Sequence, residues 1–568
     1  MKKNKYLLLV LSLMIVMGTV ILSACKKSFL DAQPYGQYTS DLIQNKKGLE
    51  GLLVGVYGVL DGQGVAGDPW ETSAVNWATA GVAADDAYKG TDANDQPQMT
   101  EVEQYKSQPA NRYFYNKWLA VYEGVARANA VIRLANDPAV VLTEDEKKNI
   151  LGQARFLRGH YHFEAKKMWN KVPYISETTT EYTNTADIWP NIEDDFKYAY
   201  DNLPESAKVA AANKWSAATY LAKTYMYEKK FTEAKALFDI ITVSGKTSSG
   251  KAYGLLDAYW KGYDAAFDNN QEQVFAVSAA ASGNVDGSGE RSLGLAFPYG
   301  GNFGCCGFYQ PSQNLVNSYK TDATGLPLFN TYNDVDLKND QGLKDADPYQ
   351  NDITTPLDPR LDWNVGRRGI PFWDWGPMPG YSWIRDQNYA GPFSPKKHIY
   401  SRKEESVLTS SGWKNITAKD LTLIRYSDVL LMAAEAEIEV GSLDKARTYI
   451  NTVRARAKDP QSWVVGAPAN YKIDIYNTAF ASQDFARTAV RHERRVELAM
   501  EGVRWFDLVR WGIAATTLNK YLEKEKLKRT YKQTASFVAG THEYFPIPGA
   551  IIDIAAKYGN KLDQNPGY

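Results

Sequence analysis

Two stretches of the chain each predict a pair of short helices in close contact, and this feature limits the possible folds more than any other. The first stretch carries Ala222, Tyr225, Ala234 and Phe238 at intervals of three, nine and four residues. The second repeats these intervals at positions 434, 437, 446 and 450. Small residues at such places let two helices cross at short distance, so both stretches predict helical hairpins.

The repeated spacing resembles that of the tetratricopeptide repeat. Gly441 and Ser442 fall between the two helices of the second hairpin, where they supply a C-terminal stop and an N-cap. About 200 residues separate the hairpins. The helices therefore form a discontinuous scaffold, and the intervening segment from about 283 to 411, rich in Gly, Pro and aromatic residues, is expected to be an insertion.

Apolar periodicity predicts helices over about 113–134, 143–169, 215–228, 231–241, 421–440, 443–457 and 483–511. No Gly/Ser linker divides the chain, so we expect one large unit or two interlocked ones. The predicted fold class is mainly α, a tetratricopeptide-like helical hairpin scaffold with a long irregular insertion. Its helical parts span about 40–282 and about 412–568.

Residues 367–383 read RRGIPFWDWGPMPGYSW and raise the question of why so much aromatic surface sits on a loop. Prolines at 371, 377 and 379 lack an N–H, and four glycines at 366, 369, 376 and 380 loosen the backbone, so neither a helix nor a central strand is expected. The tryptophans either fill gaps between helices or bind a ligand.

Composition argues against several classes of protein. The 65 basic and 66 acidic residues give a net charge of −1, which offers no general field for nucleic acid. The sequence has five histidines and no HExxH, GxSxG, P-loop or zinc-ligand spacing, so no enzyme, metal or cofactor is predicted. A glycoside hydrolase needs only two carboxylates about 5 to 10 Å apart, and the sequence leaves that alternative open.

The N-terminus predicts export and membrane attachment. Three lysines precede an apolar run over residues 7–22, and LSAC follows at 22–25. LSAC resembles the lipobox of bacterial lipoproteins, which implies a signal peptide over 1–24 and lipidation of Cys25. An uncleaved anchor helix is the alternative.

The adjacent Cys305 and Cys306 are expected to be free thiols, with a strained disulfide as the alternative.

The C-terminal third contains RHERRVELAMEGVRWFDLVRWG, residues 491–512, which we call the signature segment. Apolar residues at 496, 500, 503 and 506 predict one buried face of a single helix. Charges of alternating sign at 501, 504, 507 and 510 are expected to link successive turns weakly. HERR at 492–495 is expected to lie on a charged, solvated face of the helix.

The signature segment resembles that of the SusD-like (RagB/SusD) family of outer-membrane lipoproteins. ARFLRGHYHFEAKKMWNKVPYI at 154–175, LIRYSDVLLMAAEAEIEVG at 423–441, FPIP at 545–548 and DQNPGY at 563–568 also resemble family motifs, in the family's order. The resemblance covers nearly the whole chain from Cys25 onward.

The resemblance implies a protein that captures a nutrient, usually a glycan, and closes as a lid on a TonB-dependent transporter of the SusC type. Family members do no chemistry, and partner enzymes cut the glycan. The implied partners are an oligosaccharide or polysaccharide, that transporter and the outer membrane, from a position facing the cell exterior. Capture of peptides or another nonsugar nutrient by the same design is the alternative, although an extended peptide favours backbone pairing and charged pockets over flat indoles.

Residues 367–385 are the first candidate glycan site, because indoles cover the apolar face of a sugar ring while polar groups bind its hydroxyl rim. The candidates are Trp373, Asp374, Trp375, Tyr381, Trp383 and Arg385. A second candidate is the segment 70–90, with Trp70, Trp77 and Tyr88 as platforms. Asp85 and Asp86 there suit turns or caps more than ligand binding. A third is GNFGCCGFYQ, with Phe303, Phe308 and Tyr309. Pure packing is the alternative throughout.

Overall fold

The computed structural model describes residues 43–280, 289–409 and 413–568, so the predicted signal peptide and Cys25 lie outside the described residues. Within those ranges, no helix is both long enough and apolar enough to cross a bilayer. The longer helices are α4 (Lys46–Tyr57), α6 (Arg112–Ala135), α7 (Glu144–Trp169), α8 (Trp189–Asn202), α9 (Lys214–Tyr227), α10 (Phe231–Ser244), α15 (Tyr426–Val440), α16 (Leu443–Lys458), α17 (Gln483–Glu497), α19 (Ala514–Lys528) and α20 (Gly549–Lys557).

Local sequence sets where these helices begin and end. The Thr143 side chain accepts a hydrogen bond from the Glu146 N–H, and the Glu146 carboxylate accepts one from the Thr143 N–H, which starts α7 with a capping box. Asn213 starts α9 in the same way. As predicted, α15 ends at Gly441, and the Ser442 side chain caps α16.

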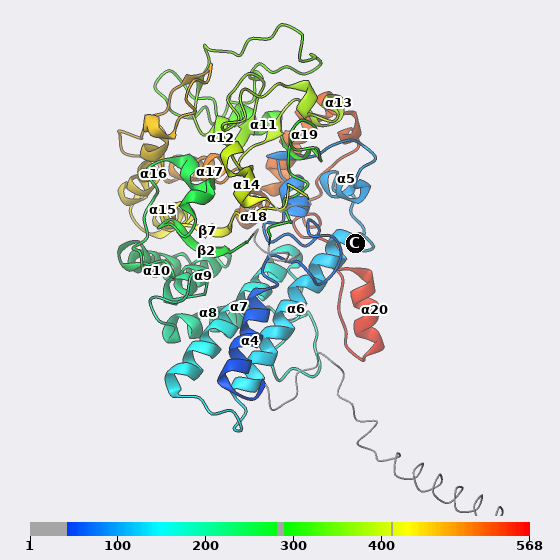
Figure 1. The fold of residues 1–568 in the computed structure, drawn as a ribbon, viewed down its shortest axis with the longest axis vertical. Coiled ribbons are helices and arrows are strands. Elements are labelled where there is room, and N and C mark those ends of the chain that lie inside the picture. Colours follow the sequence, from blue (N-terminus) through cyan, green and yellow to red (C-terminus); the bar gives the residue numbers. More distant parts are fainter. Residues whose placement is uncertain (1–42, 281–288, 410–412) are drawn as a thin grey trace, which may run out of the picture.

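Successive helices pack side by side from α6 through α10, and α10 then contacts α15, which pairs with α16 and α17. The two hairpins α9/α10 and α15/α16 are therefore neighbours in space although they are distant in sequence (Figure 1). Ala222, Ala234, Ala434 and Ala446 have no exposed surface, because each lies where two helices approach closely.

Two predicted helices differ from the structure. Residues Leu421–Arg425 form strand β7 before α15 begins, because they pair with β2 (Gln273–Val277) in an antiparallel ribbon. The helix predicted over 483–511 is broken into α17 and α18 (Arg504–Arg510). Met500 and Gly502 between them have φ values of 65° and 72°, and a Cβ at Gly502 would meet the Val75 carbonyl oxygen at 1.8 Å. Tertiary contact at this turn overrides the helical pattern.

The β2–β7 ribbon joins the two ends of the irregular segment, which occupies the end of the molecule opposite α4 and α8 (Figure 1). Its regular pieces are short: β3 (Phe308–Pro311), α11 (Gln313–Ser318), β4 (Pro356–Leu357), α12 (Leu361–Asn364), β5 (Val365–Gly366), η4 (Tyr381–Trp383), α13 (Gln387–Ala390), β6 (Ser394–Pro395), η5 (Arg402–Glu404) and α14 (Glu405–Leu408). The remaining short elements are η1 (Trp77–Gly81), β1 (Ala87–Gly90), α5 (Pro97–Glu103), η2 (Tyr259–Tyr263), η3 (Ala265–Phe267), η6 (Pro460–Ser462), β8 (Asn470–Tyr471) and η7 (Thr530–Lys532). The boundaries at about 283 and 411 remain predictions.

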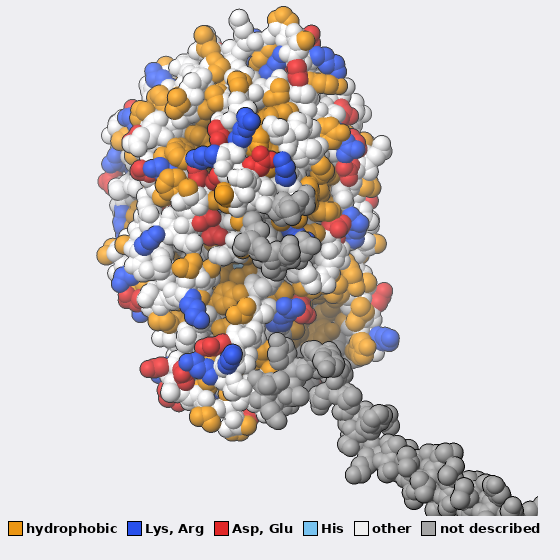
Figure 2. Space-filling model, in the orientation of Figure 1, with side chains coloured by type: hydrophobic (Ala, Val, Ile, Leu, Met, Phe, Trp, Pro, Cys, Tyr) orange, Lys and Arg blue, Asp and Glu red, His pale blue; other side chains and the backbone are white. Residues whose placement is uncertain are grey.

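Three apolar clusters hold the structure together. The largest runs through the helical scaffold, and the motifs noted at 154–175 and 545–548 contribute residues to it. Phe545 stacks on Trp505 of α18 with ring centroids 5.4 Å apart, and Asn565 donates to the Trp169 and Phe545 carbonyls. Two smaller clusters lie under the irregular segment, which therefore has a core of its own. On the face seen in Figure 2, charges of both signs are interspersed with apolar side chains.

Candidate functional site

Four tryptophans from separate segments line a cavity of about 470 Å³, which we call the tryptophan pocket. Trp260 lies in η2, Trp363 in α12, Trp373 in the turn that follows Pro371, and Trp463 directly after η6. The rest of the lining is Ala258, Lys261, Asp264, Pro371, Asp374, Ser401, Lys403, Gln461, Val464 and Val465. This volume is within the usual range for small-molecule sites, about 300 to 1,000 Å³.

The rings in the pocket lie at different angles to one another. Trp260 and Trp363 are stacked with ring planes 28° apart, whereas Trp373 is inclined by 56° to Trp363 and by 82° to Trp260. Their centroids are 5.0 to 6.4 Å apart. Trp260, Trp373 and Trp463 remain partly exposed, so the pocket presents apolar ring surface in more than one direction.

Hydrogen bonds fix two of the rings to η6. The Trp260 indole N–H donates to the Gln461 carbonyl at 3.0 Å, and the Trp363 indole N–H donates to the Ser462 carbonyl at 2.6 Å. Ser462 is itself buried, and its hydroxyl accepts from the Tyr259 N–H. Because their polar edges are already satisfied by protein groups, these indoles offer a ligand apolar surface.

The wall around Trp373 is also held in place by protein contacts. Trp373 has a φ of 50°, an uncommon value for a residue other than glycine. The Asp374 carboxylate accepts from the backbone N–H groups of Arg402 and Lys403, at 2.5 and 3.0 Å. Glu404 accepts from Ser401 and from the Ala265 N–H, which joins this wall to η3. The pocket is thus largely preorganised.

Three of the four charged side chains in the pocket lining lie beside an opposite charge. Lys261 forms an ion pair with Asp257 at 2.8 Å, and Lys403 lies 3.6 Å from Asp264. The Lys403 side chain is 66% exposed. Paired charges around indole surface favour an uncharged ligand with a polar rim over a highly charged one.

The structure places two of the predicted residues, Trp373 and Asp374, in this pocket. Trp375 is half-buried, and its indole N–H donates to the Tyr400 carbonyl at 2.9 Å. Trp383 is 7% exposed and makes edge contacts with Phe303 and Phe372, at 5.3 and 5.2 Å between centroids. These two tryptophans therefore belong to the core of the irregular segment.

Tyr381 and Arg385 lie on the surface outside the pocket lining. Tyr381 is 38% exposed, and the Lys344 ammonium group lies 3.4 Å from its ring centroid. Arg385 pairs with Asp92 and Asp95 at 2.8 and 2.6 Å. Arg385 thus joins the irregular segment to the N-terminal part of the chain.

The prediction that Trp77 and Tyr88 form an exposed binding surface is wrong. Trp77 and Tyr88 have no exposed surface, since their polar edges bond to the Ser292 carbonyl and the Glu525 carboxylate and their rings lie in the core. Trp70 is partly exposed and packs against the main core. Asp85 and Asp86 were expected to cap turns, but both form buried ion pairs with Arg495.

The third predicted platform is also buried. Phe303, Phe308 and Tyr309 are 4% exposed or less, because Phe303 packs in the core of the irregular segment and the other two pack in the main core. Cys305 and Cys306 in the same segment are joined by a disulfide, the alternative that the sequence had left open.

Sequence reasoning missed Trp260, Trp363 and Trp463. Each is an isolated tryptophan in a different segment, so no local clustering points to them. The one shared signal is that they lie in short nonhelical or single-turn pieces rather than on a long amphipathic helix. Their convergence depends on the tertiary fold.

Most charges of the signature segment are buried, contrary to the solvated face predicted for HERR. We call Glu493, Arg494, Arg495, Glu497 and Glu501 the signature charge cluster; apart from Glu501, whose side chain is 13% exposed, all are at most 6% exposed. The Glu497 carboxylate accepts hydrogen bonds from the guanidinium groups of Arg360, Arg425 and Arg456, which come from three other segments. Buried carboxylates need such partners, since an unpaired buried charge is costly. The cluster ties the irregular segment to the scaffold.

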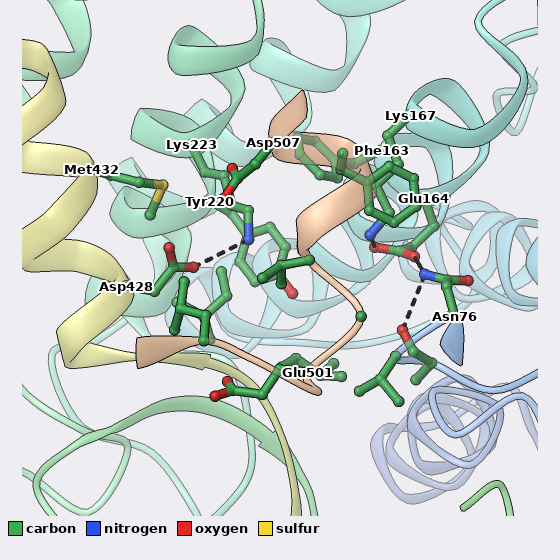
Figure 3. Close-up of a pocket in the computed structure, with 18 of the residues that line it drawn as sticks. Asn76, Phe163, Glu164, Lys167, Tyr220, Lys223, Asp428, Met432, Glu501 and Asp507 are labelled. Carbon is green, nitrogen blue, oxygen red and sulfur yellow. Dashed lines mark hydrogen bonds and ion pairs between the residues drawn. The ribbon is translucent and has the colours of Figure 1, made fainter. Parts of the chain in front are cut away.

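A second cavity lies beside this cluster, between α7, α9, α15 and α18 (Figure 3). Its volume is about 50 Å³, room for a few water molecules rather than a sugar ring. Its side chains are paired with one another: Lys167 with Glu164 at 2.5 Å, and Lys223 with Asp428 at 3.4 Å. We therefore assign this cavity to the assembly of the scaffold.

These features define a class of protein, a helical scaffold that carries an aromatic pocket on an irregular segment. The family model described as "SusD family" matches residues 271–568, and the one described as "Starch-binding associating with outer membrane" matches residues 28–226. The first match covers more than half of the chain. The chain belongs to the SusD family.

Individual relatives agree with this assignment. SusD-like protein P2 of Formosa agariphila is 23% identical over 473 residues, which cover 79% of this chain and 80% of that protein. A structure titled "Laminarin binding SusD-like protein" is 22% identical with a TM-score of 0.65, over 92% of this chain and 100% of that one. Surface glycan-binding protein A from Bacteroides thetaiotaomicron, in complex with laminarihexaose, is 19% identical with a TM-score of 0.66, over 92% and 99%. The predicted family and mainly helical fold are confirmed.

Proposed function

We propose that the protein binds a glycan in the tryptophan pocket. The observation that carries this proposal is the convergence of four indoles, held by hydrogen bonds and backbone contacts, around a cavity of about 470 Å³. A sugar ring has an apolar face of C–H groups, which an indole can cover, and a rim of hydroxyls. Lys261, Lys403 and Gln461 lie in the lining, where they can meet that rim.

Related proteins support the ligand class. Two structures with this fold are titled as binding laminarin or laminarihexaose, and one matching family model is described as starch-binding. These descriptions belong to the relatives, and they guide which glycans to try first. The paired charges at the pocket favour a neutral glycan in the same way.

Peptide capture and glycan hydrolysis are weaker alternatives. A peptide site needs free edges for backbone pairing or charged pockets, whereas the walls of this pocket are tryptophan rings and paired charges. A hydrolase needs two carboxyl groups available to substrate. Asp264 and Asp374, the two carboxylates in the lining, both accept backbone N–H bonds, which supports roles in holding the walls.

We propose further that Cys25 is lipidated, that the protein attaches to the outer membrane facing the cell exterior, and that it delivers glycan to a SusC-like TonB-dependent transporter. The description of one family model, "associating with outer membrane", supports the location. Copurification of a large β-barrel protein after gentle membrane extraction tests the partner. Repeated recovery of the tagged protein alone would count against delivery, and Cys25→Ala protein that stays in the outer membrane would count against the anchor.

Calorimetric titration with a panel of laminarin, starch and other neutral oligosaccharides tests the binding proposal. Trp373→Ala should weaken binding of the best ligand by about 2 kcal/mol, as a central aromatic anchor does. Trp375→Ala, a half-buried indole of the same loop outside the pocket, is the matched control and should retain the wild-type affinity. Equal affinity of wild type and Trp373→Ala would place the binding site elsewhere.

A further inference from the structure

We infer that Lys396 is a positioning residue for ligand binding, because its buried ammonium group ties together the two backbone segments that carry Trp363 and Trp373. This inference rests on the proposed function, since it concerns the same pocket. Lys396 does not line the pocket itself, and it acts through the two indoles.

The hydrogen bonds of Lys396 reach both segments. Its Nζ donates to the Pro371 carbonyl at 2.7 Å and also to the Asp362 carbonyl. Asp362 directly precedes Trp363, and Pro371 lies two residues before Trp373. One group thus fixes the spacing of two segments whose indole centroids are 5.0 Å apart.

The ammonium group also lies close to the aromatic rings. Its Nζ is 4.9 Å from the ring centroid of Trp363 and 5.7 Å from that of Phe372, both within cation–π range. The backbone holds the side chain in this position, because β6 pairs with β5 just before it and the Lys396 N–H donates to the Asn364 carbonyl at 3.3 Å. Two contacts therefore fix the Trp363 ring: the hydrogen bond from its indole N–H to the Ser462 carbonyl, and the Lys396 ammonium group over its face.

Packing alone does not account for a lysine at this position. Lys396 is 1% exposed, and it forms no ion pair with any residue that the structure describes. The carboxylate of Asp362 is already bonded to Arg367 and to the Tyr471 hydroxyl. Burial lowers the pKa of Lys396 to about 7, against the opposing pull of Asp362. A methionine would fill similar space without the cost of burying an ammonium group. The hydrogen bonds of that group therefore explain why a lysine is at this position.

The next residue provides a matched control. Lys397 is also 1% exposed, and its Nζ also bonds to backbone carbonyl groups. Its hydrogen bonds go to the signature segment, to the Ala499 carbonyl at 2.7 Å and the Glu501 carboxylate at 2.6 Å, and its ammonium group also lies 4.8 Å from the ring centroid of Tyr263. The two adjacent buried lysines therefore hold different parts of the structure. Lys396 holds the segments of the tryptophan pocket, and Lys397 holds the turn between α17 and α18.

The test compares Lys396→Met with Lys397→Met in full-length protein labelled with 5-fluorotryptophan. Trp363→Phe and Trp373→Phe assign the two fluorine resonances, and the best glycan of the panel is titrated calorimetrically. Lys396→Met should shift both resonances and weaken binding by about tenfold, because a loosened site loses preorganisation. Lys397→Met should lower thermal stability while leaving both resonances and the affinity of the folded protein near wild type.

The outcomes separate this inference from the proposed function. Wild-type affinity and unmoved Trp363 and Trp373 resonances in Lys396→Met would overturn the inference while glycan binding stands. If the wild type binds no glycan of the panel, the proposed function fails, and the fluorine resonances alone decide whether Lys396 positions the indoles. Should Lys396→Met not fold, Lys396→Gln, which keeps an N–H donor without the charge, takes its place with the same readouts.

Discussion

The tryptophan pocket and the signature charge cluster are built in opposite ways. The cluster comes from one continuous stretch of sequence, its charges are buried, and its partners are fixed by ion pairs. The pocket comes from five segments spread between residues 258 and 465, three of its four tryptophan rings are partly exposed, and its lining charges are few. The most recognisable stretch of the chain thus serves assembly, whereas the candidate binding surface has no continuous motif.

This difference follows from what each region must do. Buried carboxylates and guanidinium groups need all of their partners at once, so a change to one of them leaves a charge without compensation. An indole that covers a sugar ring needs only a fixed ring plane and open space in front of it. Residues that form buried ion pairs therefore constrain the fold, whereas indoles that face open space constrain which ligand can bind.

The largest expected effect is loss of stability on changing Glu497. Glu497→Ala leaves Arg360, Arg425 and Arg456 without a shared acceptor and should lower the free energy of unfolding by about 3 to 5 kcal/mol. Urea unfolding measures this. The glycan affinity of the folded fraction should stay at the wild-type value, and a stable variant with weakened binding would break the proposed separation.

A comparable loss is expected from a tryptophan that lies in the same loop as Trp373 but faces the core. Trp383→Ala should lower the free energy of unfolding by about 3 to 5 kcal/mol, because it leaves a cavity among Phe303 and Phe372. Paired thermal melts and glycan titrations check this. If Trp383→Ala melted like the wild type but lost glycan binding, the ring would be a ligand contact instead.

The contrast between Trp373 and Trp383 shows how far the sequence could be read. Alternating proline and glycine correctly predicted a loop with abundant aromatic surface, but not which rings face the core. Helices α6, α7, α9, α10 and α16 were predicted to within a few residues, because each has a local apolar period and most have a cap. The break at Met500 and the meeting of Trp260, Trp363 and Trp463 depend on contacts between distant segments, so no local pattern reveals them.

Acid should act through the charge cluster and its surroundings. Burial alone would raise the pKa of Glu501, but Arg425 and Lys397 outweigh it and lower the pKa to about 2. Burial would also raise the pKa of Glu164, which Lys167, His160 and Lys117 lower to about 2. Both pKa values lie below those of the same groups in an unfolded chain, so the two carboxylates stabilise the fold above about pH 4.5. This contribution to the free energy of unfolding is lost as the pH falls toward 2.

Unfolding free energies measured between pH 6 and pH 2.5 test this expectation. The loss over this window should be on the order of 2 kcal/mol or more for the wild type. Glu501→Gln should flatten part of the curve, since it removes one titrating group. An equally steep curve in that variant would assign the acid sensitivity to other carboxylates.

The smallest expected effect is at the rim of the tryptophan pocket. Lys403 is 66% exposed and 3.6 Å from Asp264, so Lys403→Ala should change unfolding free energy and glycan affinity by no more than about 0.5 kcal/mol each. Titration at two salt concentrations measures this. A strong loss of affinity that grows at low salt would mean that the ligand is charged.

A structure of the protein with the tightest-binding oligosaccharide of the panel tests the central claim most directly. The account predicts sugar rings in the tryptophan pocket, with at least one pyranose face against Trp373 or Trp463, and with Trp363 unmoved in its contact with Lys396. An oligosaccharide bound elsewhere, for example at the exposed ring of Tyr381 with the tryptophan pocket empty, would contradict it.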